Sequence, residues 1–99
     1  MVYSMDDLLY LLHSDGADEL RLHVGQPPVI LLDGEQQQIE GPPITAEMAE
    51  QLLQNISDTR QRRELRQYGV VDFIVTFRGR VKFVVRATIE GENVRIDIH

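Results

Sequence analysis

The last third of the chain alternates between apolar and polar residues over three consecutive segments, and a period of two is the signature of β-strands. The segments run from Val70 to Phe77, from Val81 to Thr88 and from Val94 to Ile98, with short glycine-containing turns between them. Because residues two apart share one face of a strand, this pattern predicts a three-stranded antiparallel meander with one continuously apolar face. The members of that face are Val71, Phe73, Val75, Phe77, Val81, Phe83, Val85, Ala87, Val94, Ile96 and Ile98.

The first part of the chain predicts one helix and a pair of strands. A serine and an aspartate at capping-box spacing precede apolar residues that recur at helical spacing, so a helix is expected over Met5–Ser14. Alternation predicts a strand over Glu19–Val24. The apolar run Val29–Leu32 ends at Asp33-Gly34, which is a strong turn signal. Two strands joined by a short loop follow from this pattern.

The middle of the chain predicts a short edge strand near Gln38–Glu40 and a helix over Ala46–Asn55 with an apolar stripe. A third, mostly exposed helix is expected over Thr59–Tyr68, where Gly69 ends it. With 99 residues the chain fits a single domain, residues 1–99. We expect the α+β class: a twisted antiparallel sheet of about four to five strands with two to three helices packed on one face.

Charge is unevenly distributed along the chain, whose formal net charge is −6. Residues 1–50 carry ten acids against one base, Arg21, and residues 51–99 carry six acids against nine bases. We expect the acids mainly on helices and loops, and the bases on the strand face opposite the apolar one, with Arg21 and His23 near them. These bases are predicted to dock an acidic surface of a protein partner, and the alternative is that they are solvated surface charges. The predicted partner-binding residues are Arg78, Arg80, Lys82, Arg86 and Arg95.

Several kinds of chemistry have no residues to carry them. The chain has no cysteine, so neither a disulfide nor a thiolate metal site can form. Its only lysine, Lys82, follows a strand residue and not a glycine-rich loop, so there is no phosphate-binding loop. The histidines His13, His23 and His99 lack metal-ligand spacing. We therefore expect no catalytic residue, no metal and no cofactor.

Nucleic acid and membrane are also not expected as partners. Sheet-type RNA readers stack bases on exposed aromatic residues, whereas Phe73, Phe77 and Phe83 fall on the apolar face here. The N-terminus has no basic leader, and its apolar stretch is too short to span a bilayer. We expect a cytoplasmic protein without membrane insertion.

Four segments carry a resemblance to a known family. The segment from Gly16 to Gly34, GADELRLHVGQPPVILLDG, resembles the G-A-S-D-L-H-L-x-x-G-x-P-P-x-x-R-x-D-G motif of the PilT/GspE-type secretion ATPases. Pro42–Thr45 is similar to the family's entry into its next helix, and Val71–Phe73 with Val81–Arg86 is similar to its strand hairpin. The family drives type IV pilus retraction (twitching motility) and type II secretion.

The resemblance covers nearly the whole chain but only the N-terminal, PAS-like domain of those ATPases. It implies a non-catalytic docking or regulatory domain that packs against the motor domain of a neighbouring subunit in a hexameric ring, so a homo-oligomer is a possible state. In the family, strand arginines can reach toward bound nucleotide. The corresponding positions here are Lys82 and Val84, and Arg86 stands where the family has asparagine, so the chain departs from the nucleotide-sensing pattern. The alternative hypothesis is a free-standing PAS-like sensor of a small ligand, or an adaptor module.

Overall fold

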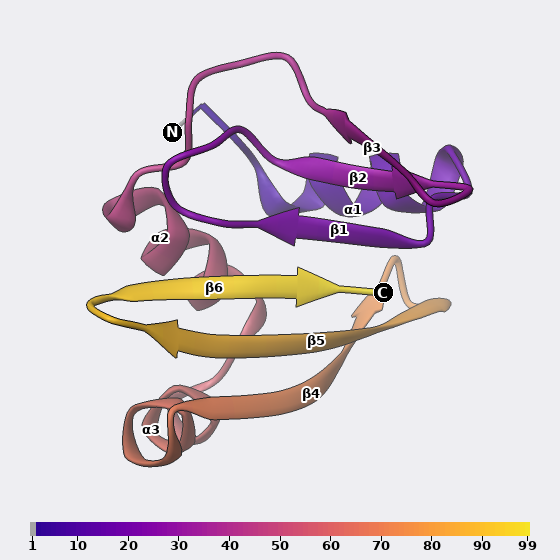
Figure 1. Cartoon of the computed structure of the whole chain (residues 1–99). Helices are drawn as coiled ribbons and strands as arrows, with labels where there is room; N and C mark the ends of the chain where they lie inside the picture. The colour runs from indigo at the N-terminus through magenta and orange to yellow at the C-terminus, as the bar shows by residue number, and fades with distance from the viewer. Residues whose placement is uncertain (1) are drawn as a thin grey trace.

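The computed structural model describes residues 2–99, which form three helices and six strands (Figure 1). In chain order these are α1 (Met5–Ser14), β1 (Glu19–Leu22), β2 (Val29–Leu32), β3 (Glu35–Gln38), α2 (Ala46–Ile56), α3 (Thr59–Tyr68), β4 (Val70–Phe77), β5 (Val81–Glu90) and β6 (Asn93–Ile98). The α+β class, the three helices and the meander of β4, β5 and β6 are confirmed.

All six strands belong to one antiparallel sheet with the order β3-β2-β1-β6-β5-β4. The prediction of four to five strands was too low by one or two. Two three-stranded units, one from each half of the chain, are joined where β1 pairs with β6. At this junction Leu20 lies opposite Ile98, and Leu22 lies opposite Ile96.

The edge strand β3 lies earlier in the chain than predicted, at Glu35–Gln38 and not at Gln38–Glu40. Asp33 and Gly34 both have positive φ, 51° and 83°, which is the conformation of a tight two-residue hairpin turn. This turn sends the chain straight back along β2, so Leu32 pairs with Glu35 at once. The position of the turn, and not β-propensity, therefore determines where β3 begins.

Strand β1 ends at Leu22, before the predicted end at Val24. Beyond Leu22 the chain separates from β2 and contacts the segment around Ile44. Val24 forms an isolated parallel bridge with Ile44. The Gly25 amide donates to the Ile44 carbonyl, and the Ile44 amide donates to the Gln26 carbonyl. These bonds attach the turn after β1 to the segment that enters α2.

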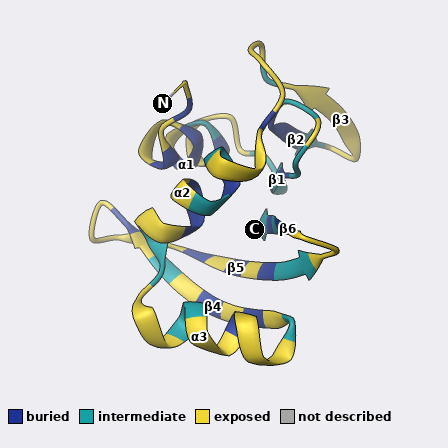
Figure 2. Cartoon of the chain, turned by 90° about the vertical axis from the view of Figure 1, so that its left-hand side faces the viewer, coloured by how far each residue is buried: buried dark blue, intermediate teal, exposed yellow. Residues whose placement is uncertain are grey.

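The apolar face of the sheet packs against the helices, as predicted. Figure 1 shows α1 behind β1 and β2, and Figure 2 shows the buried residues on the sides where helices and strands meet. From the strands, the core takes Leu20, Leu22, Ile30, Val71, Phe73, Phe77, Phe83, Val85, Ala87, Val94, Ile96 and Ile98; from the helices, it takes Met5, Leu8, Leu9, Leu12, Ala49, Leu52, Leu53 and Leu65. The opposite face of the sheet, hereafter the outer face, remains open to solvent.

The helices begin and end at the residues that capping chemistry favours. Ser4, Thr45 and Asp58 each accept a hydrogen bond from an amide in the first turn of the helix that follows. Gly69, with a φ of 82°, ends α3 in the left-handed conformation. In α3 only Leu65 is buried, as predicted for a mostly exposed helix. Among residues 2–99 no helix is both long and apolar enough to cross a membrane.

The loop before α2 is held to the start of the chain by Tyr3. Its hydroxyl donates a hydrogen bond of 2.5 Å to the Pro42 carbonyl, and its burial raises the pKa of the phenol. Gly41 lies beneath the ring with a φ of 148°, and a Cβ added there would collide with the Tyr3 hydroxyl. This contact places Gly41 among the few positions where only glycine fits.

We predict that Gly41→Ala lowers the free energy of unfolding by about 1–3 kcal/mol, because it combines backbone strain with a steric clash. Gly91→Ala is the control, since Gly91 also has positive φ but has no atom near the added Cβ. Urea denaturation measures both. Tyr3→Phe should recover part of the loss in the Gly41→Ala background. Equal losses for the two alanine variants would contradict the predicted clash.

Candidate functional site

The outer face of the sheet carries a row of alternating charges across four strands. Arg21 of β1 lies opposite Asp97 of β6, Asp97 lies opposite Arg86 of β5, and Arg86 lies opposite Asp72 of β4. Strand pairing alone places these four side chains side by side, because cross-strand partners point to the same face. We call this set the charge row.

At the β4 end of the charge row, Arg86 binds Asp72 in a bidentate manner. The Arg86 Nε donates to Asp72 Oδ1 over 2.7 Å, and the second guanidinium nitrogen donates to Oδ2 over 2.9 Å. This hydrogen bonding lowers the pKa of the Asp72 carboxyl and raises the pKa of Arg86. Both side chains are more than half exposed, so the pair orders the surface more than it stabilises the fold.

At the β1–β6 end, Asp97 contacts Arg95 of its own strand and His23, which follows β1. Arg95 Nε donates to Asp97 Oδ2 over 3.0 Å, and His23 Nε2 lies 2.8 Å from Asp97 Oδ1. Arg95 also reaches Glu90, and its hydrogen bond to Asp97 is the main reason that its pKa is raised. Arg21 pairs with Glu19 on its own strand. The prediction that Arg21 and His23 lie near the strand bases is therefore confirmed.

Between these pairs the outer face is hollowed, with a volume of about 480 Å³. Its lining combines bases and acids with one apolar side chain, that of Val84. The lining residues are Glu19, Arg21, Asp72, Val84, Arg86, Arg95, Asp97 and His99. The acids lie mainly on helices and loops, as predicted, but Glu19, Asp72 and Asp97 occupy outward strand positions. The expectation of a purely basic outer face was therefore wrong.

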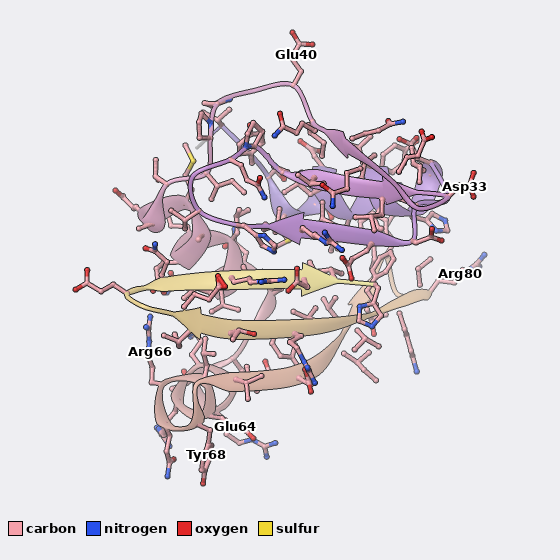
Figure 3. The ribbon with its side chains drawn as sticks, viewed as in Figure 1. Asp33, Glu40, Glu64, Arg66, Tyr68 and Arg80 are labelled. Carbon is pink, nitrogen blue, oxygen red and sulfur yellow. The ribbon has the colours of Figure 1, made fainter. Side chains whose placement is uncertain are left out.

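The structure does not bring the five predicted bases together on one face. Arg86 and Arg95 lie on the hollow with acidic partners, while Lys82 is on the same outer side of β5, opposite Thr76. Arg78 and Arg80 belong to the turn between β4 and β5, and Figure 3 shows Arg80 projecting from that end of the sheet. Within residues 2–99, Arg78, Arg80 and Lys82 form no ion pair.

Arg78 turns away from the outer face toward α1. Its guanidinium carbon lies 5.0 Å from the ring centroids of both Tyr10 and Phe77, which is cation–π geometry. The turn itself requires positive φ at Arg78 and Gly79, 52° and 68°, a conformation that is unfavourable for arginine. The contact with two aromatic rings offsets that cost and attaches the hairpin end to α1.

Exposed apolar side chains accompany the charges on β4 and β5. Ile74 and Val84 are cross-strand partners and are 63% and 42% exposed, and Val70 lies farther along the same face of β4. Sequence reasoning named Val84 and Asp72 only through the family resemblance, and it did not predict Val70, Ile74 or Asp97 as parts of a contact surface. The strand alternation could have identified them, because each of these side chains points to the same face of the sheet as Arg86 or Arg95.

The outer face offers charge pairs and apolar surface, which suit contact with another protein. Among the described residues, 2–99, no three histidine, aspartate or glutamate side chains gather as metal ligands would. The Tyr10 and Arg78 contact adds a second feature that sequence reasoning missed, because residues 68 positions apart carry no local signal.

We predict that Asp72→Asn lowers the thermal midpoint by a few degrees at most at neutral pH. Because the pKa of Asp72 is lower in the folded state, its stabilising effect is complete above the unfolded pKa of about 4 and is lost as pH falls below it. The difference from the parent should therefore vanish in acid. Thermal unfolding from pH 2 to pH 7 measures this, with exposed Glu64→Gln as the control. A difference that persists at pH 2 would contradict the ion-pair explanation.

Comparisons with known proteins give one consistent relationship. No family model matches the chain. Among curated proteins, the type IV pilus retraction ATPase PilT of Pseudomonas aeruginosa is 31% identical over 81 residues, which make up 82% of this chain and 24% of PilT. The chain therefore spans about a quarter of the length of this relative.

Solved structures match over nearly the whole chain. The crystal structure of the pilus retraction motor PilT with bound ADP superposes with a TM-score of 0.88 at 22% identity, covering 98% of this chain and 29% of that one. The ATPase DotB of Legionella pneumophila gives 0.81 at 22% identity, covering 96% and 27%. DotB of Yersinia pseudotuberculosis gives 0.71 at 14% identity, covering 95% and 28%. This chain is therefore homologous to PilT over 82% of its own residues, and it has the fold of the amino-terminal region of PilT-type ATPases.

Proposed function

We propose that these residues form a non-catalytic docking domain that contacts the motor domain of a PilT-type ATPase, either in a neighbouring subunit or in a separate partner. The observation that carries the proposal is that the PilT crystal structure superposes on 98% of this chain with a TM-score of 0.88 while this chain covers only 29% of that one. In PilT the matching part belongs to the chain of a retraction motor, which supports a role in transmitting or regulating the movement of such a motor. Pilus retraction, for which PilT is named, and type II secretion, which the sequence resemblance implies, are the contexts that we propose for it.

The bases without acidic partners support a specific contact region. Arg86 and Arg95 are engaged with Asp72, Asp97 and Glu90, so their charges are largely compensated. Arg80 and Lys82, at the hairpin end, form no ion pair within residues 2–99. An acidic patch on the motor domain would pair with them first, and Arg86 and Arg95 would form the adjoining part of the interface.

The sensor alternative is less well supported by the packing of the core. A ligand-binding module of this kind would use a pocket lined by core aromatics. Phe77 and Phe83 instead pack on each other, with ring centroids 6.3 Å apart, and Phe73 belongs to the same buried cluster. The hollow on the outer face is shallow and charged. These features favour a protein partner over a small apolar ligand.

We predict that Arg80→Glu combined with Lys82→Glu weakens binding to a separately produced PilT-type motor domain by about tenfold or more at low salt, because charges at an interface rim control association. The loss should shrink as salt rises. Titration calorimetry at several salt concentrations measures it. Arg60→Glu with Arg63→Glu, on exposed positions of α3, is the control with an identical charge change. Thermal midpoints should match, and an unchanged affinity would place the contact elsewhere.

A further inference from the structure

Strand β4 is an edge of the sheet and leaves one side of its backbone without a partner. All eight of its residues, Val70–Phe77, pair with β5. Within residues 2–99, the only other backbone hydrogen bond made by β4 is from the Arg80 amide to the Phe77 carbonyl, which closes the turn. The outward amides and carbonyls of this strand are therefore available to another strand.

The two edges of the sheet differ in how well they are protected against pairing with another strand. The opposite edge, β3, has four residues, EQQQ, all of them exposed and polar. Strand β4 is twice as long and has none of the lysines, prolines or glycines that commonly block edge pairing. Its one charge, Asp72, is held by Arg86. The Ile74 side chain is exposed beside this edge.

The helix next to β4 lies at one end of the strand. Figure 1 shows α3 at the start of β4, while the rest of the strand continues past the helix. Figure 3 shows Tyr68 and Glu64 of α3 pointing away from the sheet at that end. At the other end, Val75–Arg78 line a hollow of about 410 Å³ together with residues of α1 and α2. The part of β4 that lies beyond α3 is therefore where an added strand is to be expected (Figure 1).

The charge row indicates what that strand would carry. Across the sheet the row alternates base, acid, base, acid, and it stops at Asp72 only because β4 is the last strand. The Asp72 side chain is 51% exposed, and a base on an added strand would continue the alternation. An apolar residue opposite Ile74 would cover that side chain.

We propose that the free edge of β4 binds an extended segment of a protein partner as a seventh, antiparallel strand. On the outer face this segment carries an apolar residue opposite Ile74, followed two residues later by a base opposite Asp72. Main-chain hydrogen bonds give the affinity, and the two side chains give the register. The inference goes beyond the docking role proposed above, because the edge and the basic hairpin end are different surfaces.

A second copy of this chain is a poorer occupant. The outward residues of β4 are Val70, Asp72, Ile74 and Thr76, and none is a base. Pairing of β4 with itself would leave the charge row without a continuation and would bring together two chains that each carry a net charge of −6. The edge therefore favours a strand of different sequence.

The test uses a synthetic peptide of alternating valine and threonine with one arginine placed to face Asp72. Nuclear magnetic resonance should show slower hydrogen exchange at β4 amides when the peptide is present. Replacing the arginine by glutamate should weaken binding by about two- to fivefold or more, since opposite charges across a strand pair attract and like charges repel. A peptide N-methylated on its pairing edge should not bind.

Two protein variants locate the site. Ile74→Lys places a lysine beside the open edge and should abolish the protection of β4 amides, whereas the matched Gln36→Lys on β3 should leave it unchanged. Asp72→Asn should remove most of the preference for arginine over glutamate. The proposal is overturned if the peptide protects no β4 amide, if the N-methylated peptide binds equally well, or if the chain alone dimerises through β4.

Discussion

The pairing of β1 with β6 is the contact on which the rest of the structure depends. It joins two three-stranded units from opposite halves of the chain into one sheet. Leu20 and Leu22 on β1, and Ile96 and Ile98 on β6, are fully buried at this junction. A slip of β1 by one residue would turn Leu20 and Leu22 to solvent, so the burial of apolar surface fixes the register. Without this junction neither unit could enclose the helices in a common core.

The same junction determines the electrostatics of the outer face. It places Arg21, the one base of the acidic first half, beside Asp97 in the second half, whose net charge is positive. Acids and bases that are far apart in sequence thereby compensate one another, and the face becomes mixed where a basic one was expected. At the hairpin end of the same sheet, Arg80 and Lys82 form no ion pair within residues 2–99.

For a PilT-type amino-terminal region, this arrangement separates the core from the surfaces available for contact. The helices cover one face of the sheet, and the outer face, the hairpin end and the β4 edge remain accessible. Because Lys82 and Ile74 lie outside the core, they can change without loss of the fold. This separation fits a domain whose fold matches PilT and DotB closely at only 14–22% identity.

The sequence by itself determined the α+β class, the three helices, the residues of each meander strand that face the core, and the resemblance to PilT-type ATPases. Periodicity, capping and turn signals are local, so they do not depend on the tertiary structure. It also contained the outward parity of Asp72 and Ile74. Only the tertiary structure decided that the two halves share one sheet, that β3 follows its turn immediately, and that Arg78 stacks on Tyr10. Those features depend on which strands pair and which surfaces meet, and such long-range contacts are selected by total buried area and not by any local pattern.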